Sequence, residues 1–423
     1  MAEIKGTVDM LGRSGLTPVD DAVKILMDRL STIELSSETV SLEQSLDRIL
    51  AKPVISPEDL PTAARSTMDG YAVRAADTFG ASQTMPCYLN ITGEVLMGEA
   101  PAGEVKKGCC HKIPTGGLLP DGANSVVMLE HTVPVDETMI EIVKGVGDGT
   151  NLIQRGEDIG IHARALDAGH LLRPQDLGLL AGIGVADVPV FKKLRVGIVS
   201  TGDEIVPYGK KPLPGQIRNI NSITLSGMIT RAGALPIDYG IVSDRMEIFF
   251  PAMEKAVLEN DIVLFSGGSS VGVRDLGEQA VEALGPPGIF IHGVALKPGK
   301  PLLMGLSGTT PVFGLPGHPV SALVCFDLFV QPAIIKLSGL GREMEPPPQT
   351  LAAKLSRNIN SAPGRKDVIR VRLKKNDGSW IASPVMGKSG SISTLSRAHG
   401  FFFIDEDSQG VSEDSTVEVF FYK

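Results

Sequence analysis

Three apolar segments, each followed by a polar loop and then by a helical pattern, constrain the fold of this chain more than any other feature. They are "LRVGIVSTGDE" from Leu194, "ALPIDYGIVSD" from Ala234 and "DIVLFSGGSS" from Asp261. Repeated strand–helix units of this kind are typical of a mostly parallel sheet covered by helices. Ligands of such sheets bind beyond the carboxyl ends of the strands. We therefore expect the functional site in these polar loops.

A chain of 423 residues is too long for a single hydrophobic core. The expected fold is a multidomain combination of α/β and β domains. Short β-type runs separated by glycine and proline turns mark the second domain, and clean alternation in "DVIRVRLKK" marks the last one. The expected domains are an elongated N-terminal domain of residues 1–55 and 155–190, an inserted β module of residues 56–154, a mostly parallel α/β domain of residues 191–342, and a small C-terminal β-barrel of residues 343–423.

Helix signals occur at three places. Thr17 and Pro18 are expected to cap and begin a helix whose apolar face includes Val19, Leu26 and Leu30. Asn221 is the expected cap of a second helix, which stops at Gly233. A third helix is expected from Pro319 to Leu337.

Composition excludes several classes of protein. A net charge of −9 argues against a general nucleic-acid binder. No apolar run approaches the ~20 residues of a membrane helix, and the N-terminus lacks a signal peptide. The four cysteines show no C-x-x-C spacing, which favours free thiols over a metal site. We expect a cytoplasmic protein that binds neither membrane nor nucleic acid.

Five loops of the α/β domain carry residues suited to binding anions or metals. The glycine-rich loop after the third strand is expected either to form an anion-binding nest from its backbone N–H groups and hydroxyls or to be a simple glycine-rich turn. Two lysines flank a Pro-Gly turn, and two prolines stiffen the entry to the helix at 319. The residues are Glu204; Asp244; Gly267, Gly268, Ser269, Ser270 and Asp275; Lys297 and Lys300; and Pro316 and Pro319.

The acids have two interpretations. Asp244 and Asp275 each stand three residues before a glutamate, which is capping-box spacing, so each is a candidate helix cap. Acids beside anion donors also suit Mg²⁺, which uses one or two carboxylates together with substrate phosphates. His318 is likewise either a ligand or an ordinary turn residue.

A set of segments in order along the chain resembles the signatures of the molybdopterin molybdenumtransferases, the MoeA family, whose fold is also found as the gephyrin E domain. No single segment is specific, but the set is. The segments are "STMDGYAV" (66–73), "PTGGLLPDGANSVVMLE" (114–130), "RGEDI" (155–159), "STGDEI", "NSITLSGMI", "FSGGSSVGVRD", "LKPGKPLLMG" and "GLPGHPVSA".

The resemblance implies an enzyme that inserts molybdate into adenylylated molybdopterin, with Mg²⁺, and releases AMP and the molybdenum cofactor. It implies an elongated homodimer whose active site lies between the α/β domain of one subunit and the β module of the other. The family's catalytic positions match Asp69, Thr115, Glu204, Asp244 and Asp275, with Asp244 and Asp275 expected at the metal. Its substrate-binding positions match Lys297, Pro316, Pro319, Arg365 and Ser389, and His318 stands where some relatives carry asparagine.

Other functions stay open at this point. The same fold also serves as a scaffold that binds a partner protein. A related sheet domain performs the adenylylating step, and the enzyme that does so is a candidate partner. Tungstate in place of molybdate is a further alternative that the residues do not distinguish.

Overall fold

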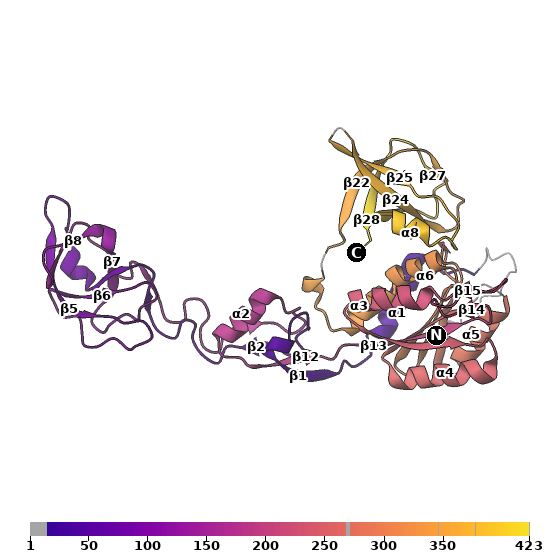
Figure 1. Cartoon of the computed structure of the whole chain (residues 1–423), viewed down its shortest axis with the longest axis horizontal. Helices are drawn as coiled ribbons and strands as arrows, with labels where there is room; N and C mark the ends of the chain where they lie inside the picture. The colour runs from indigo at the N-terminus through magenta and orange to yellow at the C-terminus, as the bar shows by residue number, and fades with distance from the viewer. Residues whose placement is uncertain (1–14, 268–270, 346, 377, 423) are drawn as a thin grey trace. The chain divides into compact units, whose positions relative to one another are not determined.

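The computed structural model describes residues 15–267, 271–345, 347–376 and 378–422, with the backbone alone at 271–275 and 342. The chain forms two compact units (Figure 1). One is Thr39–Val190, and the other combines Met1–Glu38 with Phe191–Lys423.

The unit Thr39–Val190 contains a six-stranded sheet in the order β7-β4-β6-β5-β9-β8, in which only β5 and β6 run parallel. These strands lie within the β module expected at residues 56–154. Their bounds are β4 (Gly70–Val73), β5 (Cys87–Glu94), β6 (Cys109–Ile113), β7 (Ser125–Met128), β8 (Thr132–Pro134) and β9 (Met139–Ile142).

This unit has separate hydrophobic cores. Residues between 71 and 152 pack inside and beside the six-stranded sheet. Residues 50 and 54 share another core with residues 166–190, so two segments that flank the β module in the sequence fold together. The elements of this second part are β2 (Val54–Ile55), β11 (Arg164–Leu166), α2 (Pro174–Gly182) and β12 (Asp187–Phe191).

The α/β domain lies in the other unit and is built on a six-stranded sheet in the order β16-β13-β17-β21-β20-β18. The first four strands are parallel, as expected, and β20 runs antiparallel to both of its neighbours, β21 and β18. The elements are β13 (Arg195–Thr201), α3 (Asn221–Arg231), β16 (Leu235–Val242), α4 (Met246–Glu259), β17 (Ile262–Gly267), α5 (Val271–Ala283), β18 (Pro287–His292), β20 (Leu303–Ser307) and β21 (Thr310–Leu315).

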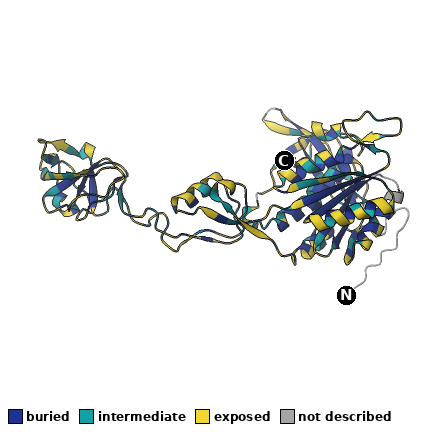
Figure 2. Cartoon of the chain, turned by 60° about the horizontal axis from the view of Figure 1, so that its bottom comes forward, coloured by how far each residue is buried: buried dark blue, intermediate teal, exposed yellow. Residues whose placement is uncertain are grey.

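Both faces of this sheet are covered, so its central strands are apolar without interruption. In β17, Ile262 and Leu264 point to one face, and Val263 and Phe265 point to the other, because side chains alternate along a strand. The first face packs against α3 and the helix at 319–337, and the second packs against α4 and α5. In Figure 2 the strands are dark blue, and the covering helices turn yellow sides outward.

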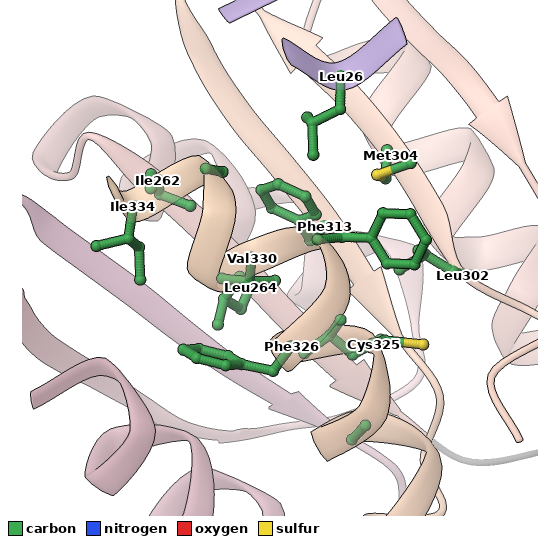
Figure 3. Close-up of a cluster of buried hydrophobic side chains, with 14 of the residues drawn as sticks. Leu26, Ile262, Leu264, Leu302, Met304, Phe313, Cys325, Phe326, Val330 and Ile334 are labelled. Carbon is green, nitrogen blue, oxygen red and sulfur yellow. The ribbon is translucent and has the colours of Figure 1, made fainter. Parts of the chain in front are cut away.

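The helix expected from Pro319 to Leu337 is present as α6 (Pro319–Cys325), a π-helical turn (Phe326–Val330) and α7 (Gln331–Leu337). Among the described residues it is the one helix long and apolar enough to cross a membrane. Figure 3 shows Phe326, Val330 and Ile334 within the same cluster as Phe313 of β21. The length and apolar composition of this helix therefore reflect its burial in the core.

The first helix, α1 (Val19–Leu30), packs against the α/β domain, although its sequence lies within the expected N-terminal domain of residues 1–55. Val19, Ala22, Leu26 and Leu30 form one face and join the cluster that contains α7. Thr17 is not its cap: the helix begins after Pro18 without a side-chain cap, and Thr17 pairs with Val294 as a short parallel bridge. The apolar face of α1 is therefore buried against the α/β domain.

The cap expected at Asn221 is also wrong. The side chain that accepts a hydrogen bond from the first turn of α3 is Asn219, whose Oδ1 lies 3.3 Å from the backbone nitrogen of Ser222. The buried amide of Asn221 instead donates to Ser266 Oγ (2.7 Å) and to the carbonyl of Gly317 (2.9 Å). Asn221 thus connects the ends of β17 and β21.

The C-terminal domain is a closed barrel of five strands, as expected. The ring runs β24-β25-β22-β28-β26 and back to β24. Strand β19 (Leu296–Lys297) of the α/β domain extends the barrel by pairing parallel with residues 366–367. The elements are β22 (Thr350–Leu355), β24 (Lys366–Asn376), β25 (Ser379–Pro384), α8 (Ser393–Arg397), β26 (Gly400–Ile404) and β28 (Thr416–Phe421).

A buried carboxylate holds the start of α2. Asp176 is 4% exposed and accepts hydrogen bonds from the backbone and guanidinium of Arg173 and from His170. Burial raises the pKa of Asp176, but the hydrogen bonds from Arg173 and His170 outweigh burial and bring its pKa well below the usual range. Asp176 therefore stays ionised in the folded protein.

Replacing Asp176 by asparagine is expected to destabilise α2 by about 3 kcal/mol, because removing one member of a buried charged cluster leaves the others unpaired. Native-state hydrogen exchange of the α2 amides in the full chain measures this. Since the pKa is depressed on folding, the stabilisation is complete above the unfolded pKa of about 3.9 and is lost as the pH falls below it. Asp167→Asn, at the exposed pair with Arg164, is the control and should leave exchange unchanged.

Candidate functional site

A pocket of about 440 Å³ lies where the carboxyl ends of β17 and β21 meet the barrel. Its wall comes from four places: the end of the sheet, the turn after β19, the turn before α6, and two barrel loops. The lining residues that carry polar or backbone chemistry are Gly267, His292, Lys297, Lys300, Pro316, Gly317, His318, Ser321, Arg365 and Ser389.

The turn between the two lysines has a shape that requires glycine. Gly299 has φ +134°, and a Cβ there would lie 2.6 Å from Leu296 Cδ2 and 2.9 Å from Cys325 Sγ. Only glycine fits without displacing the helix behind it. This turn brings Lys297 and Lys300 to the same pocket, as expected from "KPGK".

Lys297 is bound by the barrel. Its Nζ lies 2.6 Å from Oδ2 of Asp367, a carboxylate whose side chain is only 2% exposed. Ser361 Oγ donates to the same oxygen at 2.9 Å, while Asp367 Oδ1 is buried without a hydrogen-bond partner in the structure. The pair joins the two domains and fixes the ammonium group in the pocket wall.

The barrel also closes over the start of α6. The backbone N–H of Val320 donates to the Ser389 carbonyl at 3.1 Å, so this N–H is not available to an anion. His318 Nδ1 and Ser389 Oγ lie 2.8 Å apart and form a hydrogen bond between the domains. The mouth of the helix is therefore a joint between side chains from two domains.

The charge of the pocket is positive. Lys300 and Arg365 have no ion-pair partner within 4 Å in the part of the chain that the structure describes, whereas Lys297 has Asp367. His292 lies 3.5 Å from Glu278, with both side chains partly exposed. The arrangement is suited to an anion, which would receive charge-assisted hydrogen bonds from Lys300 and Arg365.

Asp244 and Glu204 lie on the same edge of the sheet, after β16 and β13. Thr201 Oγ1 donates to Asp244 Oδ1 at 2.5 Å. The capping interpretation of Asp244 is wrong, because α4 begins after Arg245 and has no side-chain cap. The carboxylate is instead oriented by a hydroxyl at the end of β13, which leaves it partly exposed toward the edge of the sheet.

The strand order gives the distance along the edge from Asp244 to the Pro316 turn of the pocket. β16, β13, β17 and β21 are neighbours in that order, so Asp244 stands three strands from the Pro316 turn. At about 4.8 Å per strand, this is roughly 14 Å along the edge. Thr201 pairs with Gly267, a pocket residue, so the Thr201–Asp244 hydrogen bond borders the pocket.

The other predicted acid, Asp69, belongs to the unit Thr39–Val190. The backbone N–H of Thr115 donates to its Oδ1 at 2.7 Å. Hydrogen bonds from the backbone and then the hydroxyl of Thr115 lower the pKa of Asp69. Two loops far apart in sequence are thus joined at the predicted catalytic pair, and Asp69 is held as a carboxylate.

The remaining predicted residues differ in whether they line the pocket. Gly267, Lys297, Lys300, Pro316, Arg365 and Ser389 all line one pocket. Pro319 is buried at the start of α6 and is not among the lining residues. Gly268, Ser269, Ser270 and the Asp275 side chain lie outside the described residues, and no three His, Cys, Asp or Glu side chains within the described part form a metal site.

Two pocket-related residues, Asp367 and His292, were not predicted from the sequence. A signal for Asp367 existed: it is an acid at the start of the alternating run "DVIRVRL", where a buried side chain is expected to be apolar. Nothing in the sequence indicated that its partner would be a lysine some 70 positions earlier. His292 had no signal beyond its place at a strand end.

Comparisons with known proteins agree along the whole chain. Family models match as the MoeA N-terminal region (domain I and II) at residues 17–184, the "Probable molybdopterin binding domain" at 197–336, and the MoeA C-terminal region (domain IV) at 352–422. The molybdopterin molybdenumtransferase of Haemophilus influenzae is 32% identical over 95% of this chain and 97% of its own length. That of Bacillus subtilis is 32% identical over 97% and 95%.

Solved structures agree as well. A structure of the molybdopterin biosynthesis MoeA protein from Pyrococcus horikoshii matches with a TM-score of 0.80 and 32% identity, covering 96% of this chain and all of that one. Identity and coverage at this level, across all three family regions, show that the chain belongs to the MoeA family of molybdopterin molybdenumtransferases, enzymes of molybdenum cofactor biosynthesis.

Proposed function

We propose that this chain inserts molybdate into adenylylated molybdopterin and releases AMP and the molybdenum cofactor. The observation that supports this most is the pocket in which Lys297, Lys300, Arg365 and Ser389 converge beside the acidic edge of the sheet. The reaction must bring molybdate, a dianion, to a polyanionic pterin nucleotide. A cationic pocket next to oriented carboxylates is suited to that task.

In this proposal the basic and the acidic residues have different roles. Lys300, Arg365 and the Ser389 hydroxyl bind an oxyanion, and Lys297 lends a positive charge that Asp367 holds in place. Asp244, oriented by Thr201, and Glu204 face the phosphate end of the substrate. Gly267 begins the glycine-rich loop that we assign to phosphate binding.

We propose a homodimer in which Asp69 and Thr115 act on the substrate held by the partner subunit. The support is that the backbone N–H of Thr115 donates to Asp69 and orients this carboxylate, which forms no ion pair among the described residues. A cytoplasmic location follows from the biosynthetic role, and the adenylylating enzyme is the expected donor of substrate.

Mg²⁺ fits the donor set. Asp244 supplies one carboxylate that a hydroxyl already orients, and Asp275 follows the glycine-rich loop. Mg²⁺ binds through one or two carboxylates and completes its shell with waters and substrate phosphates. When bound, it would offset the repulsion between the two anions and polarise the phosphate that is cleaved.

The test is AMP release from purified adenylylated molybdopterin by the full chain, with molybdate and Mg²⁺. Release that depends on molybdate is expected. AMP incorporation instead of release would point to the adenylylating step, and no turnover with retained partner binding would point to a scaffold. Replacing molybdate by tungstate in the same assay shows which oxyanion is preferred.

Removing the charge of a predicted catalytic acid is expected to slow AMP release on the order of 100-fold, or about 2.7 kcal/mol. Asp69→Asn and Asp244→Asn test this well, since asparagine still accepts the hydrogen bonds from Thr115 and Thr201. Asp261→Asn, at the amino-terminal edge of the sheet, is the control with unchanged rate. Normal rates for Asp69→Asn, Asp244→Asn and Asp275→Asn together would contradict the assignment.

Asp367→Asn is expected to raise the KM for molybdate about tenfold, or about 1.4 kcal/mol, with a smaller effect on kcat. The substitution leaves Lys297 without its buried partner and releases the ammonium from the pocket wall. Asp20→Asn is the matched control, because Asp20 pairs with the neighbouring Lys366 but is 85% exposed. An unchanged KM in Asp367→Asn would show that the position of Lys297 does not determine molybdate binding.

A further inference from the structure

The hydrogen bond between His318 and Ser389 has no role in the function proposed so far. His318 precedes α6 in the α/β domain, and Ser389 lies in the barrel loop between β25 and α8. Both line the pocket, with His318 Nδ1 2.8 Å from Ser389 Oγ. The imidazole and the hydroxyl therefore meet in the pocket where we place the oxyanion.

Ser389 has little freedom except at its hydroxyl proton. Its carbonyl accepts the N–H of Val320, which fixes the backbone of the loop against the first turn of α6. The Oγ position is then set by His318. What remains variable is which of the two atoms, Nδ1 or Oγ, supplies the proton of their hydrogen bond.

The imidazole has three forms, two neutral tautomers and the imidazolium, and each leaves different hydrogen-bond donors in the pocket. If neutral His318 carries its proton on Nε2, the Ser389 hydroxyl donates to Nδ1 and cannot donate to an anion. If the proton is on Nδ1, the hydroxyl is free, but Nε2 presents a lone pair. The imidazolium, like the Nδ1 tautomer, donates to Oγ and frees the Ser389 proton, and it alone adds a second N–H and a positive charge. An oxyanion in the pocket therefore favours the imidazolium.

Whether the other charged groups favour or disfavour protonation of His318 depends on whether an anion is bound. Lys300 and Arg365 disfavour a second positive charge while the pocket is empty, and Lys388 is adjacent to Ser389 in sequence. Of the negative groups nearby, Asp367 is paired with Lys297, and Glu278 lies 3.5 Å from His292. A bound dianion reverses this balance, because it places negative charge among these cations.

We propose that His318 takes up a proton when molybdate binds and that the imidazolium turns the Ser389 hydroxyl toward the anion. His318 is thus a positioning residue that links molybdate affinity to pH. The inference rests on the proposed function, since it takes this pocket as the molybdate site. Histidine suits this role because it is the side chain that ordinarily titrates between about pH 5 and 8.

Titration calorimetry of the full chain with molybdate, in buffers of different ionisation enthalpy, measures the proton uptake directly. About one proton per anion is expected near neutral pH, and affinity should fall by up to ~10-fold per pH unit on the alkaline side. Molybdate remains a dianion throughout this range, so it does not titrate itself. Sulfate serves as a second dianion with the same property.

The variants separate His318 from its neighbours. His318→Asn keeps a donor for Ser389 Oγ but cannot titrate, so proton uptake should vanish and affinity should become nearly independent of pH. His292→Asn, the other pocket histidine, should retain the uptake. Ser389→Ala should weaken binding but retain the uptake, because the imidazolium still faces the anion.

Two results would overturn the proposal: binding by the wild-type chain without proton uptake, or uptake that persists in His318→Asn. Both leave the proposed function intact, because molybdate still binds. Absence of molybdate binding to the wild-type chain is a different outcome, and it would reject this pocket as the oxyanion site together with the inference.

Discussion

The pocket keeps its shape because a buried carboxylate of the barrel, Asp367, binds the ammonium group of Lys297 from the sheet domain. Burying a charge is unfavourable unless a partner compensates for it. The buried Asp367 carboxylate therefore requires the Lys297 ammonium, and this requirement keeps Lys297 in place. Strand β19 strengthens the joint by pairing with β24 at the same two residues. The domains cannot separate here without exposing this pair, and the contacts of Ser389 with Val320 and His318 form a second link between them.

Topology explains why the acids and cations share one edge of the sheet. The chain goes from β13 to β16 on one side and then crosses to β17 on the other, which makes a switch point between β13 and β17. Thr201 and Gly267 are partners at this point. Thr201 orients Asp244, and Gly267 belongs to the pocket, so adjacent strand ends lead to opposite charges. The spacing of strands sets the distance between these groups.

Local patterns predicted the elements well, whereas partners across domains were beyond them. The helix Pro319–Leu337 and the alternating strand at 366–376 follow from periodicity, which each segment carries in itself. The caps assigned to Asn221 and Asp244 were wrong because each side chain found a stronger partner on a neighbouring strand end. Docking of α1 and burial of Asp367 depend on surfaces distant in sequence. Family signatures located the pocket residues, but not the contacts that orient them.

The pairing of charges determines which cations of the pocket are available to an anion. Asp367 offsets Lys297, which leaves Lys300 and Arg365 as the cations without an ion-pair partner among the described residues. Two positive charges balance one dianion, and a second anion must then find its own compensation. We propose that this compensation lies on the acidic side of the edge, roughly three strand spacings away, where the carboxylates would bind a cation. Acids at one part of the edge and cations at another would then hold the two anions at separate places along the same edge of the sheet.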